Sequence, residues 1–94
     1  MDAVSDSLSG WKYVGGDIRH ERTSKGVCIA SANNLRFLAP GHRGHLIFID
    51  QNGLPVVVVR GGEFAHPDWT ATFTSCTPLE IILAACNATI HTNP

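Results

Sequence analysis

The chain has 94 residues, of which 44% are hydrophobic, and its formal net charge is −1. This length suits one domain with one modest core, and the ordinary apolar content excludes general disorder. No apolar run approaches the ~20 residues that span a bilayer, which excludes a membrane-spanning helix. The elements begin with a predicted flexible leader over residues 1–10, followed by a single α+β domain over residues 11–94.

The leader and the cysteine count suggest a compartment. The first ten residues carry two aspartates, no basic group and no apolar core, which is unlike a signal peptide. The chain has three cysteines, and an odd number argues against a disulfide framework. We therefore expect a cytoplasmic protein with reduced thiols.

The first predicted elements are short strands joined by turns. Gly15 and Gly16 permit the positive φ that a type I′ turn needs, so residues 11–20 are predicted to form a hairpin. Asparagine tolerates the left-handed region, which favours a second turn. The two strands that flank it and the turn itself are predicted at residues 27–31, 35–39 and 32–34.

The strongest hairpin signal is Asn52-Gly53, which lies between two apolar runs. A two-residue loop at this point fixes the register of the flanking strands, 45–51 and 54–60. The predicted cross-strand pairs are Ile49 with Val56, Phe48 with Val57, and Ile47 with Val58. Four consecutive valines indicate a central strand that is buried on both faces or that forms an interface on one.

The last strand and the helix after it have the clearest pattern. Trp69, Ala71 and Phe73 alternate with three threonines, which predicts a strand with one apolar and one hydroxyl face. A capping box is predicted at the start of the helix, where Thr77 and Glu80 would exchange hydrogen bonds. The apolar residues that recur at helical spacing are Leu79, Ile82, Leu83, Cys86 and Ile90.

These elements predict an α+β fold, an antiparallel β-meander of about five or six strands with one C-terminal helix packed on it. A sheet that carries a single helix has surplus apolar surface, which favours self-association. We therefore expect a small non-catalytic protein-interaction module that forms a homodimer and binds a further protein. The expected interface residues are Val57, Val59, Ile81 and Ala85.

The segment from Trp69 to Ile81, with Thr77-Pro78 at its corner, resembles the end of the actinobacterial domain-of-unknown-function family numbered 317. The polar turn early in that family's pattern would be residues 23–26 here. The resemblance implies a run of short strands closed by a helix, and a bacterial or mobile-element origin. It implies no functional residue, because no activity is established for the family.

Two groups of side chains could carry chemistry. His42 and His45 could bind zinc with ligands from elsewhere in the chain, but a loop with two solvated histidines is the simpler interpretation. The further ligands would come from His20, His66, His91, Cys76 and Cys86. Cys76 precedes a helix, where its thiol pKa would fall, and His66 could act as its base, but a packed corner residue is the simpler interpretation. We predict no catalytic residue, no metal site and no cofactor.

Nucleic-acid binding is the alternative function. Residues 12–45 carry six basic side chains against two acidic ones, which could form a positive face. Trp11 and Tyr13 could stack on bases beside that face. The basic residues of this alternative site are Lys12, Arg19, Arg22, Arg36 and Arg43.

Overall fold

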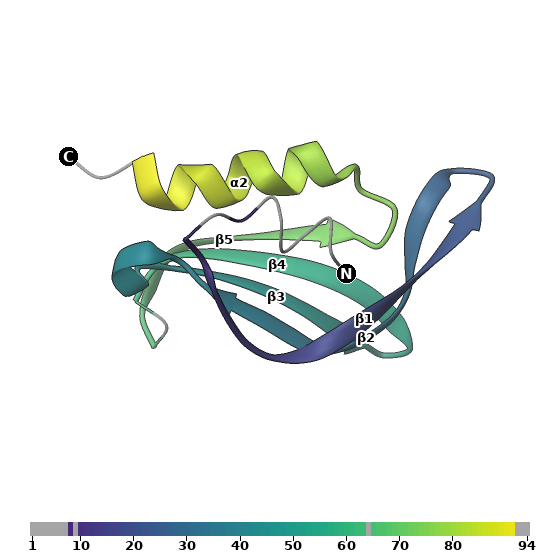
Figure 1. Cartoon of the computed structure of the whole chain (residues 1–94), viewed down its shortest axis with the longest axis horizontal. Coiled ribbons are helices and arrows are strands. Elements are labelled where there is room, and N and C mark those ends of the chain that lie inside the picture. The colour runs from purple at the N-terminus through teal and green to yellow at the C-terminus, as the bar shows by residue number, and fades with distance from the viewer. Residues whose placement is uncertain (1–7, 9, 64, 92–94) are drawn as a thin grey trace.

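The computed structural model describes residues 8, 10–63 and 65–91. Figure 1 shows a curved antiparallel sheet with one helix lying across its concave side. The strands are β1 (Lys12–Thr23), β2 (Gly26–Leu38), β3 (Gly44–Gln51), β4 (Leu54–Gly62) and β5 (Pro67–Thr74), in the order β1-β2-β3-β4-β5. The 3₁₀ turn η1 (Pro40–His42) precedes β3, and helix α2 (Leu79–His91) follows β5. The predicted α+β meander with one C-terminal helix is confirmed.

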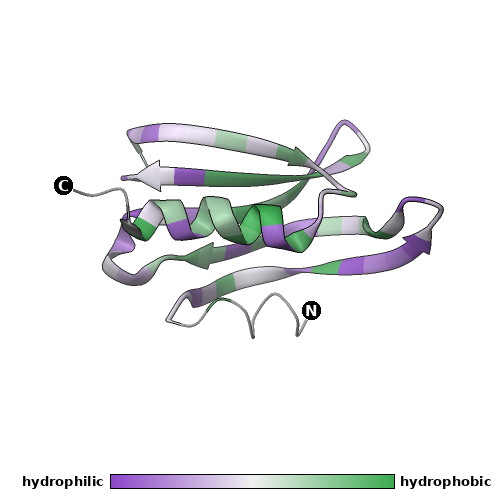
Figure 2. Ribbon diagram, turned by 90° about the horizontal axis from the view of Figure 1, so that it is seen from above, coloured by the Kyte–Doolittle hydropathy of each residue, from purple (hydrophilic) through white to green (hydrophobic). Residues whose placement is uncertain are grey.

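The core lies between the sheet and α2, which contacts β3 and β4. One row of neighbouring residues across the sheet is Leu35, Phe48, Val57 and Phe73, and the next is Phe37, Leu46, Val59 and Ala71. Helix α2 contributes Ile82 and Cys86, which are 3% and 1% exposed. The apolar face of the helix therefore closes the concave side of the sheet. Figure 2, seen from above, shows the helix lying over the strands, with hydrophobic residues in green.

The Asn-Gly hairpin has the predicted register. Asn52 and Gly53 have φ angles of 56° and 83°, which is the left-handed pair that a type I′ turn requires. The predicted pairs Ile49–Val56, Phe48–Val57 and Ile47–Val58 are all present. The two residues of the turn thus fix which valines of β4 lie on the same face as which residues of β3.

The predicted hairpin at Gly15 and Gly16 is wrong, because β1 runs through both glycines. The β1–β2 register shifts on either side of Gly15, so the strand bulges here instead of reversing. Gly16 has a φ of 85°, and a Cβ on it would overlap the backbone carbonyl of Asn34. Asn34, in the turn predicted at 32–34, has a φ of 52° and lies within β2. A residue with positive φ fits a β-bulge as well as a turn. The turns predicted at Gly15-Gly16 and at residues 32–34 are therefore bulges within β1 and β2.

The chain reverses instead between β1 and β2. Thr23 pairs with Gly26, whose φ is 100°, and the Lys25 N–H donates to the Thr23 hydroxyl at 3.0 Å. The short predicted strands are thus continuous in the structure, as the two long strands β1 and β2. The part of this pair that lies beyond the β2–β3 pairing, from Asp17–Asn33 to Thr23–Gly26, extends past the end of β3, and we call it the arm. Figure 1 shows this arm curling up toward the connection between β5 and α2.

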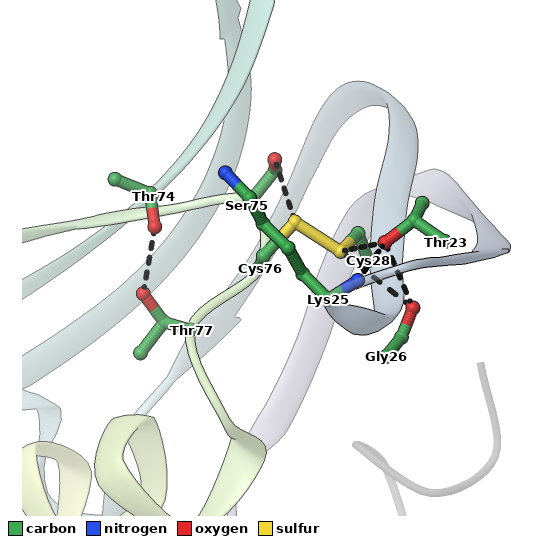
Figure 3. The surroundings of a disulfide bond; sticks show 8 residues. All are labelled: Thr23, Lys25, Gly26, Cys28, Thr74, Ser75, Cys76 and Thr77. Atoms are coloured by element: carbon green, nitrogen blue, oxygen red, sulfur yellow. Dashed lines mark hydrogen bonds between the residues drawn. A yellow bond between two sulfur atoms is a disulfide. The ribbon is translucent and has the colours of Figure 1, made fainter.

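A disulfide joins the arm to that connection. Figure 3 shows Cys28 of β2 bonded to Cys76, and their Cα atoms are 4.4 Å apart. The Ile29 N–H also donates to the Ser75 carbonyl at 3.0 Å. The expectation of three reduced cysteines was therefore wrong, because a count of three leaves one cysteine free once two have paired. Cys86 is the free one, and it is buried.

The start of α2 differs in detail from the predicted capping box. The Thr77 hydroxyl lies 3.2 Å from the Thr74 hydroxyl, and the Thr77 N–H donates to the Thr74 carbonyl at 3.2 Å. The hydroxyl and the N–H of Thr77 are thus both bound to Thr74 at the end of β5. The corner is held by the strand before it, and Pro78 begins the helical turn by accepting from the Ile81 N–H at 3.1 Å.

Residues 1–7 and 9 of the predicted leader lie outside the described residues. Leu8 is 5% exposed and packs into the core, and its carbonyl accepts from the Trp11 N–H at 3.0 Å. The packed domain therefore includes residue 8.

Candidate functional site

The face of the sheet away from α2 is the main surface that no helix or strand of the described residues covers. We call it the helix-free face. It consists of the side chains that alternate with the core residues on β1–β5. One row across it is Lys12, Leu38, His45, Arg60 and Thr70; the next is Arg36, Ile47, Val58 and Thr72; the third is Ile49, Val56 and Thr74. Among the described residues, these three rows hold cations, apolar groups and hydroxyls and no carboxylate.

The apolar residues of the helix-free face are buried at its centre and more exposed toward its β1 side. Ile47 and Val58 at its centre are 7% and 8% exposed. Ile49 and Val56 beside them are half-buried, and Val14 at the β1 side is 46% exposed. The centre of this face is therefore already largely buried. The apolar groups around it are still accessible to water and would gain from contact with another apolar group, in proportion to the area that is covered.

A hollow of about 230 Å³ opens in this face. Its lining residues are Val14, Arg36, Phe37, Leu38, His45 and Ile47. This volume is below that of the clefts that take drug-sized ligands, roughly 300–1,000 Å³. It is large enough for one side chain of a partner, and Arg36 is the cationic residue among those that line it.

The cations of the helix-free face come from three strands, Lys12 from β1, Arg36 from β2 and Arg60 from β4. Arg36 on β2 and Arg60 on β4 flank β3 and are offset by two residues along it, so their backbones are about 12 Å apart. The guanidinium of Arg36 lies against Gly15, where no side chain competes for the space. The Nε atom of Arg36 is buried and makes no hydrogen bond among the described residues. A carboxylate docking on this face would supply the missing acceptor.

His45 lies between these two arginines. Burial lowers the pKa of its imidazole from the usual 6.5, and the positive charges of Arg60 and His42 lower it further. The neutral imidazole is therefore the favoured form on the folded protein. At neutral pH the charge of this face comes from Lys12, Arg36 and Arg60.

The lowered pKa of His45 predicts a loss of stability in mild acid. His45 binds a proton more tightly in the unfolded chain than in the folded one. The contribution of neutral His45 to the free energy of unfolding is therefore complete above pH 6.5, and it is lost as the pH falls through the pKa that His45 has in the folded protein. We expect the melting temperature to fall between roughly pH 7.5 and 5.5, and to fall less in His45→Gln. His20 retains part of the effect in that variant, because burial lowers its pKa too.

The control for this prediction is His66→Gln, which removes an exposed histidine from the loop before β5. Thermal melts followed by circular dichroism over the pH series give the comparison. Equal acid sensitivity in His45→Gln and the wild type would show that His45 does not carry the effect.

The structure separates most of the basic residues predicted as a nucleic-acid site. Arg19 and Arg22 lie on the arm, opposite Ser31 and Val27. Lys12 and Arg22 stand at opposite ends of β1, ten residues and about 30 Å apart. Only Lys12 and Arg36 of the predicted set share the helix-free face. The remaining member, Arg43, precedes β3 and pairs with Asp68 at 3.6 Å.

The predicted interface residues are also divided. Val57 and Val59 are fully buried under α2, so their side chains are closed to a second chain. Ala85 is partly buried against the core, and Ile81 on the outer side of α2 is 49% exposed. The valines that point away from the helix are Val56 and Val58. The Asn-Gly register together with the helix position would have identified them, and would also have added Arg60.

The remaining chemical candidates find no supporting geometry. Cys76 is in the disulfide, so its sulfur is not available as a nucleophile that His66 could activate as a base. Burial raises the pKa of the Cys86 thiol to about 12, which keeps it protonated and unreactive. No group of three or more histidine, cysteine or acidic side chains within residues 8, 10–63 and 65–91 could hold a metal ion around His42 and His45 or elsewhere. In the same residues no helix has the length and apolar character to cross a membrane.

Comparison of the chain with protein-family models, with curated proteins and with solved structures found no match. The family resemblance of the segment from Trp69 to Ile81 therefore stays a prediction.

Proposed function

We propose that the protein is a small non-catalytic interaction module whose helix-free face binds a partner protein that is both apolar and acidic. The observation that carries this proposal is a sheet face with accessible apolar groups, a side-chain-sized hollow and cations on three strands, without a carboxylate in its three rows. Apolar contact would supply affinity, and the charges would select the partner and speed its association.

Nucleic-acid binding is the weaker interpretation of the same face. Proteins that bind single strands on a sheet combine a positive groove with aromatic side chains on which bases stack. Tyr13 lies on the other side of the sheet, where its ring is 5.9 Å from that of Phe37. The three rows of the helix-free face contain no aromatic residue, so its few cations would have to bind phosphate without stacking.

A second copy of the chain is also a poor ligand for this face. A twofold contact brings the same patch of both copies together, so Arg36 and Arg60 would meet cations and no carboxylate. Like charges placed together cost several kcal/mol, to order of magnitude, in an interface. An acidic partner meets the same cations with opposite charge, which favours a heterologous complex.

The disulfide bears on where this complex would form. Thiols in the cytosol are kept reduced, whereas secreted and periplasmic proteins keep their disulfides. The Cys28–Cys76 bond therefore favours an oxidising compartment over the cytoplasm that the sequence suggested. Alkylation of the thiols before cell lysis, followed by mass spectrometry, distinguishes the two compartments.

Selection from a phage-displayed library of random peptides tests the proposed function. We expect the selected peptides to combine aspartate or glutamate with apolar residues. The Arg36→Glu/Arg60→Glu variant is expected to bind these peptides about tenfold or more weakly, because it reverses both charges that flank β3. Fluorescence anisotropy with labelled peptides measures the change.

The matched control is Arg19→Glu/Arg22→Glu, which makes the same change in net charge on two exposed residues of the arm. It should leave the affinity of the peptides unchanged. Equal weakening by both variants, or peptides without acidic residues, would contradict the proposal. Binding of a single-stranded oligonucleotide that only the Arg36→Glu/Arg60→Glu variant loses would favour the nucleic-acid alternative.

A further inference from the structure

Strand β5 is an edge of the sheet, and no other strand of the described residues pairs with its outer side. Figure 2 shows β5 as the outermost strand on its side of the molecule, and no described segment runs along its outer edge. Its other edge pairs with β4 from Val56–Thr74 to Gly61–Trp69. Alternate backbone N–H and C=O groups of residues 69–74 therefore point outward, unpaired within the sheet, as a template for another strand.

The opposite edge of the sheet is protected in a way that β5 is not. The β1 pairing contains three register shifts, and β1 carries charged side chains along its length, both of which discourage edge-to-edge pairing. Those charged residues are Lys12, Asp17, Arg19, Glu21 and Arg22. On β5, Pro67 and Asp68 occupy only the first two positions, and residues 69–74 consist of three threonines alternating with Trp69, Ala71 and Phe73.

From this contrast we infer that β5 pairs antiparallel with β5 of a second copy of the chain, which extends the two sheets into one. A twofold axis perpendicular to the sheet places residues of the same face opposite each other. Threonines therefore meet threonines, and the apolar residues meet apolar residues. Cross-strand threonine pairs are favourable, and residues 69–74 bring no like charges together. Trp69 and Phe73, which are half-buried in one copy, would gain further cover.

The helices leave room for this arrangement. Helix α2 contacts β3 and β4, so the two helices of the dimer would be separated by about four strand spacings, or about 19 Å. Packed helices approach to roughly 8–10 Å, so the two copies of α2 would not collide. The helix-free faces of both copies would lie on one side of the joined sheet.

The protected edge also sets the size of the assembly. Each chain offers one open edge, which its copy covers, while the charged and bulged β1 edges remain at the two ends. Pairing of like with like is isologous and closes after two chains. The inference rests on the β5 edge and is independent of ligand binding by the helix-free face.

Sedimentation equilibrium over a range of protein concentrations tests this dimer. The wild type should show a dimer that dissociates on dilution. Thr70→Lys/Thr72→Lys should raise the dissociation constant at least tenfold, because two cations of each chain would face those of its copy. Both threonines are exposed on β5, so the substitutions leave the fold of the monomer intact.

Ser31→Lys is the control, since it adds a cation at an exposed position on the arm and should leave the dimer unchanged. Circular dichroism verifies that the variants fold. Hydrogen exchange locates the contact, because amides in residues 69–74 should become more protected as the protein concentration rises. A monomer at all concentrations, or a dimer that both lysine variants leave equally intact, would overturn the inference.

Discussion

Reduction of the Cys28–Cys76 disulfide is expected to lower the free energy of unfolding by about 4 kcal/mol. The bond joins residues 48 positions apart, and the entropy of closing a loop of that length in the unfolded chain corresponds to this value. A domain of this size has a total stability of roughly 5–14 kcal/mol. The reduced protein should therefore melt about 15–30 °C lower than the oxidised one.

Urea denaturation of the wild type with and without reductant measures this loss, and Cys28→Ser/Cys76→Ser is the matched variant. The variant should match the reduced wild type and should itself be insensitive to reductant. The buried hydroxyl at position 28 retains a neighbour, because the Thr23 hydroxyl lies 3.2 Å from the Cys28 sulfur. A loss below about 1 kcal/mol would show that the pairing of β1 with β2 holds the arm without the bond.

Replacement of Ile82 by alanine is expected to cost about 3 kcal/mol of stability. Ile82 is 3% exposed and packs from α2 into the core cluster with Phe48 and Val57. Truncating a buried isoleucine removes its transfer free energy and leaves a cavity, which together cost roughly 2–5 kcal/mol. Urea denaturation of the oxidised protein gives the value.

The neighbouring residue provides the control for Ile82→Ala. Ile81 is the same residue type in the same helical turn but is 49% exposed. Ile81→Ala should change the stability by no more than about 0.5 kcal/mol, as is usual for surface positions. Equal losses from the two variants would mean that α2 does not cover the sheet in the orientation described.

The sequence was informative where one local rule determined the outcome. Asn52-Gly53 allows few turn types, so the register of β3 and β4 followed from two residues. The alternation from Trp69 to Thr74 and the helical spacing after Pro78 were equally direct. The threonines of β5 are exposed and the apolar residues between them are half-buried, as predicted.

The sequence failed where a local rule allowed two outcomes. A glycine with positive φ fits a turn or a bulge, and the choice at Gly16 depended on the close approach of Asn34 from the next strand. The valines 56–59 could face the helix in either alternation, and the position of α2 decided it. The disulfide depended on the arm curling back to the corner after β5, which no local pattern records. The helix-free face combines residues from all five strands, so it too required the fold.

The disulfide closes a covalent ring that holds β2 after Cys28 and all of β3, β4 and β5, while β1 and α2 lie outside it. If the oxidised chain is pulled by its two ends, the tension passes across the sulfur bridge and does not reach the strands inside the ring. Only β1 and α2 can then be drawn out, and the stretched molecule is shorter by about 160 Å than its reduced form. Strands β3, β4 and β5 are thus mechanically shielded.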